Sequence, residues 1–256
     1  MWSPKQLADS DLHTMLKRDG VYWIFDLDGT LIDLADRPGR VHVPPSLLSD
    51  LTSLADLYGG RVAVVSGRAL SDLKVQIPLA ALTLVGNHGA EWRLQGKEWT
   101  TPLPPQTEAS LQAVRPLLLQ LAHRYTASLL EDKGVSLSFH VRHLSPPEKM
   151  QCEQELHRVM EPMESLQLRP GQECWEIRPR PGPNKGDAVR ELLSRVQGAA
   201  WPLVFGDDWT DEDAFEAANS HGVTVVIGDR RPTQAQFWLP QPATLRTLLH
   251  RISADR

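Results

Sequence analysis

The sequence predicts an α/β protein, in which a parallel β-sheet flanked by helices carries a smaller inserted α+β domain. Short apolar runs alternate with longer amphipathic stretches, as they do in consecutive βαβ units. Several of these runs are apolar at successive positions, which is typical of parallel strands covered by helices on both faces. Two segments rich in proline, 101–105 and 178–183, interrupt the alternation and indicate the limits of the insert.

The core is expected to be Rossmann-like, with parallel strands over residues 21–25, 61–65, 82–85, 203–205 and 223–227. Helices are expected over 47–58, between the first two strands, and over 187–196, before the fourth. A hairpin across 91–99, turning at Gln95-Gly96, is expected after the third strand. The segment 7–16 fits either a helix docked on the core or a loose extension.

The insert is expected to form a cap domain over 103–180, which leaves a core built from 1–102 and 181–256. Consecutive prolines at 104–105 end the first part of the core, because proline cannot continue a helix or a central strand. Within the insert, helix and strand patterns alternate over 108–124, 135–141, 147–160 and 174–178.

Composition and charge limit the classes of partner. The 256 residues are 41% hydrophobic and 23% charged, as in soluble globular proteins. A formal charge of −5 disfavours nucleic acid and anionic membranes, so a phosphate-bearing ligand needs local cations or a metal. The sequence shows no secretion signal and no apolar run of membrane-spanning length, and Cys152 and Cys174 are too few for a disulfide framework. We therefore expect a cytoplasmic protein. The protein is also expected to be a monomer.

A pair of carboxylates follows the first strand. Asp26 and Asp28 lie in the segment 25–31, at the carboxyl end of the strand, where open α/β sheets bind their ligands. Gly29 permits the sharp turn that leaves the strand. Taken alone, the pair also fits a turn or a helix cap.

Three further features are expected at the same edge of the sheet. Ser66 ends the second strand and offers a hydroxyl group, and Lys185 begins a helix, so its ammonium and the helix N-terminus together favour an anion. The block 206–213 ends another strand with five acidic residues, a donor set that suits Mg²⁺. An acidic helix N-terminus is the alternative for this block, but it leaves Asp207 unexplained.

These four pieces, in this order, resemble the haloacid dehalogenase (HAD) superfamily of phosphotransferases. The resemblance implies that Asp26 attacks phosphorus and forms an aspartyl-phosphate. Asp28 then protonates the leaving sugar oxygen and later deprotonates the hydrolytic water. Ser66 and Lys185 bind the phosphoryl oxygens that are being transferred.

The same resemblance implies a magnesium site. Mg²⁺ is expected to bind Asp26, the backbone carbonyl of Asp28 and Asp207, with Asp208 and Asp211 supporting its water shell. An anionic carboxylate and a phosphate dianion repel each other, so this cation and Lys185 are needed before attack can occur.

More specific fragments resemble the trehalose-6-phosphate phosphatase family. They are residues 65–68, 86–91, 131–134, 140–142, 176–179, 184–186 and 206–213. The resemblance implies that Glu131, Lys133 and Glu176 contact glucose hydroxyls. It assigns four further residues to substrate binding: Gly67, Arg68, His88 and Arg142. Val141 departs from the family, which usually has a tyrosine there.

Other interpretations remain open at this point. Glu131 and Lys133 also fit a solvated surface pair, and Glu176 fits the rim of a hinge. The substrate is expected to be trehalose 6-phosphate, and the alternative is another glycosyl phosphate, such as sucrose phosphate or glucosylglycerol phosphate. A non-catalytic sensor of phosphosugars is disfavoured, because binding alone does not require both Asp26 and Asp28. The surroundings of Ser66 and Lys185 match neither a serine-hydrolase elbow nor a nucleotide-binding loop.

Overall fold

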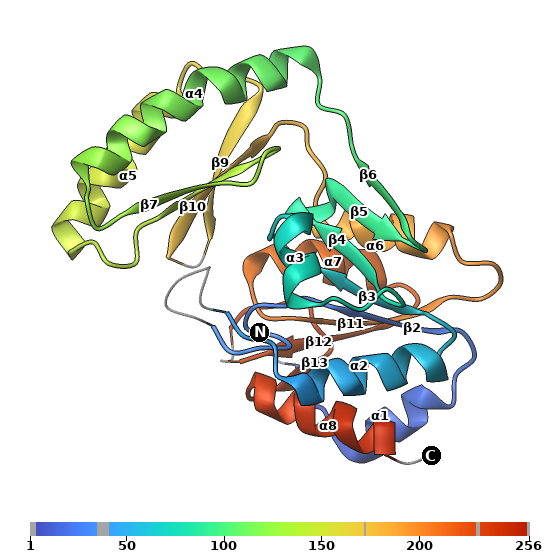
Figure 1. The fold of residues 1–256 in the computed structure, drawn as a ribbon. Coiled ribbons are helices and arrows are strands. Elements are labelled where there is room, and N and C mark those ends of the chain that lie inside the picture. Colours follow the sequence, from blue (N-terminus) through green and yellow to red (C-terminus); the bar gives the residue numbers. More distant parts are fainter. Residues whose placement is uncertain (1–3, 35–40, 172, 229–230, 255–256) are drawn as a thin grey trace. The chain divides into compact units, whose positions relative to one another are not determined.

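The computed structural model describes residues 4–34, 41–171, 173–228 and 231–254 (Figure 1). The chain divides into two compact units, Met1–Trp99 with Asn184–Arg256, and Thr100–Pro183. The second unit contains the whole of the segment 103–180 that the sequence marks as an insert. The chain as a whole has a mixed α/β architecture, and the sheet of the first unit is mostly parallel. This confirms the predicted fold class.

A nine-stranded sheet forms the centre of the first unit, in the order β1-β13-β12-β11-β2-β3-β4-β5-β6. The pairings from β1 to β4 are parallel, and β5 runs antiparallel to β4. The strands are β1 (Lys5–Gln6), β2 (Val21–Phe25), β3 (Val62–Val65), β4 (Thr83–Gly86), β5 (Glu91–Leu94), β6 (Lys97–Thr100), β11 (Trp201–Gly206), β12 (Val223–Ile227) and β13 (Phe237–Leu239). Because β2 lies between β11 and β3, the carboxyl ends of these three strands are neighbours.

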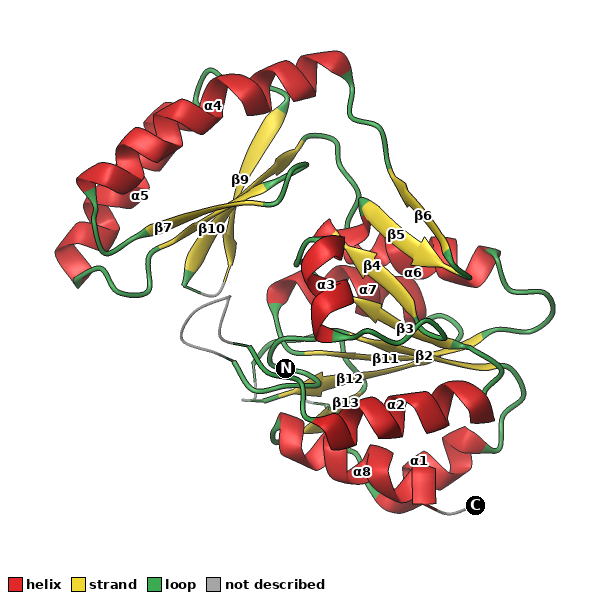
Figure 2. Cartoon of the chain, viewed as in Figure 1, coloured by secondary structure: helices red, strands yellow, loops and turns green. Residues whose placement is uncertain are grey.

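Helices cover both faces of this sheet (Figure 2). They are α1 (Asp9–Leu16), α2 (Pro45–Leu57), α3 (Leu70–Gln76), α6 (Lys185–Ser194), α7 (Glu212–Ala218) and α8 (Pro242–Ala254). Trp23 and Phe25 of β2 belong to the core cluster that includes residues of α1, α2, α3 and α8. Tyr22 and Ile24 belong to the cluster that includes residues of α6 and α7. This two-sided burial explains why the strand is apolar at every position.

The second unit is an antiparallel sheet with two helices. Its strands lie in the order β7-β8-β10-β9. The elements are α4 (Pro105–Arg124), β7 (Leu129–Asp132), β8 (Leu137–His140), α5 (Pro146–Met160), β9 (Leu166–Gly171) and β10 (Cys174–Pro179). Leu137, Phe139 and Ile177 share one core cluster with Leu118 of α4 and Leu156 of α5. Ser138 and Glu176 alternate with these residues along the strands, so they lie on the opposite face of the sheet.

The predicted strands and helices are confirmed, with small shifts at their ends. The helices expected from 47, 108 and 147 begin at Pro45, Pro105 and Pro146. Proline suits the first turn of a helix because the amide hydrogen it lacks has no helical partner there. The segment 7–16 forms α1, whose Leu12 and Met15 are buried in the core. Among the described residues, none of the helices combines the length and hydropathy that a membrane crossing requires.

Four strands were not predicted from the sequence: β1, β7, β9 and β13. β1 and β13 have two and three residues, which is too short for a period to show. β7 and β9 are the edge strands of the second sheet and mix apolar with charged side chains. Edge strands bury only part of their surface, so their sequences carry a weak pattern.

Candidate active site

Three neighbouring strands and one helix place the predicted side chains at the same edge of the first sheet. Asp26 directly follows β2, Ser66 follows β3, and Asp207 follows β11. The amide of Asp26 donates to the carbonyl of Phe205 on β11 (2.9 Å), which fixes the chain as it leaves the sheet. Lys185 is the first residue of α6, where Asn184 caps the helix by accepting from the Asp187 amide (2.9 Å).

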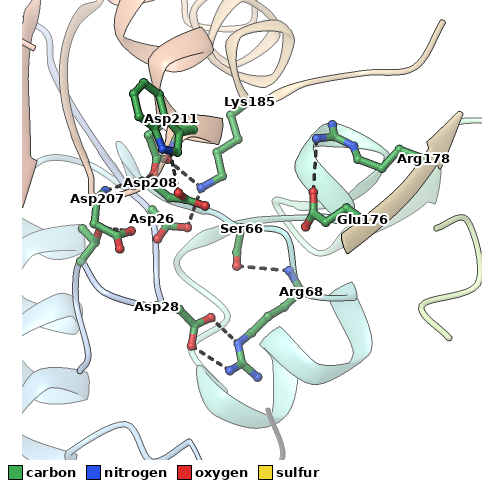
Figure 3. Close-up of polar contacts among 12 residues, drawn as sticks. Asp26, Asp28, Ser66, Arg68, Glu176, Arg178, Lys185, Asp207, Asp208 and Asp211 are labelled. Atoms are coloured by element: carbon green, nitrogen blue, oxygen red, sulfur yellow. Dashed lines mark hydrogen bonds and ion pairs between the residues drawn. The ribbon is translucent and has the colours of Figure 1, made fainter. Parts of the chain in front are cut away.

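Lys185 joins two carboxylates in the interior (Figure 3). Its Nζ lies 2.8 Å from Oδ1 of Asp26 and 2.7 Å from Oδ1 of Asp211. The exposed fractions of Lys185, Asp26 and Asp211 are 3%, 6% and 2%. Burial alone would lower the pKa of Lys185, but the two carboxylates outweigh burial and raise it. The side chain is therefore a permanent ammonium group at the centre of the site.

Three carboxylates gather beside this ammonium group. Oxygen atoms of Asp26, Asp207 and Asp211 lie within 4.8 Å of one another. Burial, reinforced by the neighbouring carboxylates and opposed by Lys185, raises the pKa of Asp26 to about 7. Burial also raises the pKa of Asp207, and the charges of Asp26 and Asp211 raise it further. A cluster of oxygen donors that is short of positive charge suits a hard divalent cation such as Mg²⁺.

Two glycines make room for this cluster. A β-carbon on Gly29 would lie 2.0 Å from Oδ2 of Asp207, and the φ of +81° at Gly29 is itself left-handed. A β-carbon on Gly206 would lie 2.3 Å from Cγ of Asp211. The two positions therefore exclude any side chain, and the carboxylates occupy the space that this leaves.

Asp28 faces a different partner. Its carboxylate accepts from Nε of Arg68 at 2.5 Å and from Nη2 at 2.8 Å, and Nη1 of Arg68 binds Asp72 at 2.5 Å. Although burial would lower the pKa of Arg68, the two carboxylates raise it. Arg68 is the residue predicted to contact substrate, and Asp28 is the residue predicted to transfer a proton. In the structure the two are paired with each other (Figure 3).

The acidic block is arranged differently from its expected division of roles. Asp211, expected in support, places its carboxylate in the cluster and also accepts from the amides of Asp207 (3.1 Å) and Asp208 (3.0 Å). Asp208, expected near the metal, accepts from the amide of Trp209 (2.7 Å) and caps the short 3₁₀ turn Trp209–Asp211. The spacing of the carboxylates along the sequence does not reveal which of them point inward, because their directions depend on the conformation of the 3₁₀ turn.

A second loop supports the segment 66–70. Asn87 and His88 adopt left-handed backbone conformations, with φ of 47° and 56°, and both are buried. Their amides donate to the carbonyls of Arg68 (2.7 Å) and Ser66 (2.9 Å), with Gly67 between these two residues. Left-handed backbone is strained for residues other than glycine. Such strain persists only where surrounding contacts hold the backbone, and it is often found at functional sites.

Glu91 holds both loops. Its Oε2 accepts from the amide of Leu70 (2.7 Å) and from Nδ2 of Asn87 (2.8 Å). Sequence reasoning singled out neither Glu91 nor Asn87 for a role. The signal available was their place in the segment 86–91, which carries the family resemblance.

In the second unit, the predicted residues Glu131 and Glu176 lie on one face of the sheet. Glu131, Ser138, Glu176 and Arg169 face one another in a single row across β7, β8, β10 and β9. Oε2 of Glu131 lies 2.9 Å from Nε2 of His140, a partner that the sequence did not indicate.

The other predicted residues of this unit lie nearby in the sheet or in its turns. Oε2 of Glu176 lies 3.6 Å from Nη1 of Arg178, and Nη2 of Arg178 donates to the Pro183 carbonyl (2.8 Å). Lys133 follows β7, and its amide donates to the carbonyl of Ser136 (3.0 Å). Arg142 lies in the turn after β8.

Comparison with known proteins identifies the family of the chain. The profile of the trehalose-phosphatase family matches residues 24–243. The chain belongs to this family. A protein of Escherichia coli (strain K12) named trehalose-6-phosphate phosphatase is 32% identical over 220 residues, which cover 85% of this chain and 80% of that protein. A Sinorhizobium fredii (strain NBRC 101917 / NGR234) protein named "Probable trehalose-phosphate phosphatase" is 32% identical over 245 residues, covering 93% and 91%.

Solved structures share the fold of this family member. The C-terminal domain of C. albicans trehalose-6-phosphate phosphatase superposes with a TM-score of 0.86 at 22% identity, covering 99% of this chain and 98% of that one. A similarity of this kind establishes the HAD-type fold expected from the sequence. The family assignment itself comes from the sequence matches, which span both units of the chain.

The buried carboxylates predict a link between pH and metal binding. The pKa of Asp26 is about 7 in the folded protein against an ordinary value of 3.8, so between these values the folded state binds the extra proton. Rising pH then destabilises the metal-free protein. A divalent cation replaces the protons, so we expect Mg²⁺ to raise the melting temperature more at about pH 7.5 than at about pH 5.

Differential scanning fluorimetry with and without Mg²⁺ measures this effect. Asp207→Asn is the control, because it removes a carboxylate of the cluster and should abolish most of the shift. A stabilisation by Mg²⁺ that is equal or larger at the lower pH would contradict the assignment of this carboxylate cluster as a Mg²⁺ site.

Proposed function

We propose that the protein is a phosphatase that hydrolyses trehalose 6-phosphate to trehalose and phosphate. One observation carries the proposal. In a chain that matches the trehalose-phosphatase family over 24–243, a buried carboxylate at the end of the central strand is held by an ammonium group and faces two further carboxylates. This arrangement suits a nucleophile that works on an anionic ester.

Mg²⁺ is the proposed cofactor. The carboxylates of Asp26, Asp207 and Asp211 would hold it, with the Asp28 carbonyl as a further oxygen ligand and Asp208 supporting its water shell. When bound, the ion would supply positive charge that offsets the repulsion of the phosphoryl oxygens by these carboxylates. The oxygen-only donor set and the raised pKa values of Asp26 and Asp207 support this choice of ion.

In the first chemical step, a carboxylate oxygen of Asp26 forms a bond to phosphorus while the bond between phosphorus and the sugar oxygen breaks. Asp28 gives its proton to the departing sugar oxygen, so the product is a neutral hydroxyl group and not an alkoxide. Lys185 and Ser66 hold phosphoryl oxygens during the transfer. Lys185 is suited to this role because it remains charged although it is buried.

In the second step, water attacks the phosphorus of the aspartyl-phosphate and Asp28 accepts its proton. The bond from Asp26 to phosphorus breaks, which releases phosphate and restores the carboxylate. The two hydrogen bonds from Arg68 hold the Asp28 carboxylate in place at this edge of the sheet. In the first step Asp28 carries a proton, so the pairing with Arg68 has to loosen when substrate is bound.

Substrate selection is assigned to the second unit and to the loops around Ser66. Glu131, Lys133 and Glu176 are proposed to bind glucose hydroxyls through charge-assisted hydrogen bonds. Four further residues are proposed to contact the substrate: Gly67, Arg68, His88 and Arg142. The shared row of Glu131 and Glu176 supports the proposal, because it sets two acceptors on one face of the sheet.

A panel of sugar phosphates tests the proposed substrate. We expect kcat/KM for trehalose 6-phosphate to exceed that for glucose 6-phosphate and sucrose 6-phosphate by at least about tenfold, because a pocket built from hydrogen-bonding groups rejects ligands that leave them unpaired. Asp26→Asn should abolish turnover while substrate still binds in calorimetry. Equal kcat/KM values across the panel would refute the substrate assignment, and full turnover by Asp26→Asn would refute the chemistry.

Replacing Glu176 by Gln tests the role of the second unit. The substitution keeps the shape but removes the charge, so we expect KM for trehalose 6-phosphate to rise about tenfold or more, as for the loss of a hydrogen bond to a charged group. Hydrolysis of para-nitrophenyl phosphate, which has no sugar, should change little. The matched control is Glu161→Gln on the exposed surface of the same unit. A parallel loss of activity on both substrates would contradict the assignment of Glu176 to sugar binding.

A further inference from the structure

Arg231 reaches the acidic loop that follows β11. Its Nε and Nη2 donate to the carbonyl of Asp207 at 3.3 and 3.2 Å, and Nη2 also donates to the carbonyl of Asp208 at 2.8 Å. Its Nη1 lies 2.5 Å from Oε1 of Glu212, at the start of α7. One guanidinium group thus binds two consecutive carbonyls of the loop and a carboxylate at the start of α7.

The loop is held from two sides. The carbonyls of Asp207 and Asp208 point to Arg231, whereas the amides of the same two residues donate to Oδ2 of Asp211 at 3.1 and 3.0 Å. Together these bonds fix the direction of the backbone between the two residues. The carboxylates of Asp207 and Asp211 are carried by this backbone, so their mutual distance depends on it.

Glu212 secures the arginine in turn. Its carboxylate also accepts from Oγ1 of Thr233 (2.8 Å) and from the amide of Gln234 (2.7 Å). The side chains of Arg231 and Glu212 are only 17% and 14% exposed, so this pair is poorly screened by water. Arg231 also lies over the ring of Trp209, 4.7 Å from its centroid. These contacts join the segment 231–234 to the acidic loop.

We infer that Arg231 is a positioning residue for the divalent metal: it holds Asp207 and Asp211 ready to bind the ion. The inference rests on the proposed function, because it takes the carboxylate cluster to be the metal site. Glu212 balances the charge of Arg231, so the main contribution is geometric. A planar fork that binds two carbonyls has no equivalent in lysine, whose ammonium group acts as a point charge.

The experiment compares Arg231→Ala and Arg231→Lys with the wild type. Mg²⁺ is titrated in two ways, by the shift in melting temperature and by phosphate release from trehalose 6-phosphate. We expect both variants to need at least about tenfold more Mg²⁺, as is usual when a residue that orients metal ligands is lost. At saturating Mg²⁺, kcat should return to near the wild-type value. The lysine variant keeps the charge, so the test still applies if the alanine variant does not fold.

Arg251→Ala is the matched control. Arg251 also forms a two-bond ion pair, with Asp9 at 2.7 and 3.0 Å, but on an exposed surface. Its Mg²⁺ requirement should equal that of the wild type. The inference is overturned if Arg231→Lys binds Mg²⁺ as the wild type does, or if kcat falls at saturating Mg²⁺ while the Mg²⁺ requirement is unchanged. A wild type that shows neither Mg²⁺-dependent stabilisation nor turnover overturns the proposed function together with this inference.

Discussion

The buried ammonium group of Lys185 is the interaction on which the site depends. It contacts Asp26 and Asp211, and Asp207 completes a group of three carboxylates around one cation. At an effective dielectric constant of about 20, two like charges about 4 Å apart repel by on the order of 4 kcal/mol. Lys185 offsets part of this repulsion. The repulsion that remains favours binding of protons or of a divalent cation by the three carboxylates. Phosphoryl transfer needs positive charge at this place, because the phosphoryl group is itself anionic.

The fold provides this arrangement through strand order. β2 lies between β11 and β3, so residues far apart in the chain end at the same edge of the sheet. Close approach there requires glycine at 29 and 206, where a β-carbon would collide with the carboxylates. The left-handed pair Asn87 and His88 supports the segment that carries Ser66 and Arg68. Backbone geometry that is costly in isolation is thus concentrated where side chains need accurate placement.

The sequence was informative about Asp26, Ser66, Lys185 and Asp207 because each adjoins a strand end or a helix start. An apolar run in the sequence shows where a strand ends. The topology of α/β sheets then brings the carboxyl ends of the strands together at one edge. The same reasoning predicted the α/β class and the parallel strands β2, β3, β4, β11 and β12 of the core. The short or edge strands β1, β7, β9 and β13 lacked a pattern of this kind.

Contacts that depend on turn geometry could not be predicted in this way. The inward turn of Asp211 and the capping role of Asp208 follow from the conformation of a single 3₁₀ turn. Arg231 lies more than twenty residues beyond the carbonyls it binds, in a segment without a regular pattern. Asp72 lies in the first turn of α3, whereas Arg68 precedes this helix, so helical spacing did not indicate their ion pair.

The central claim is that Asp26 carries the phosphoryl group during turnover. Acid quenching of the enzyme during hydrolysis of trehalose 6-phosphate, followed by peptide mapping with mass spectrometry, tests it most directly. We expect a phosphorylated peptide that contains Asp26 and that is absent from enzyme quenched without substrate. A phosphoryl group located on any other side chain, Ser66 included, would contradict it.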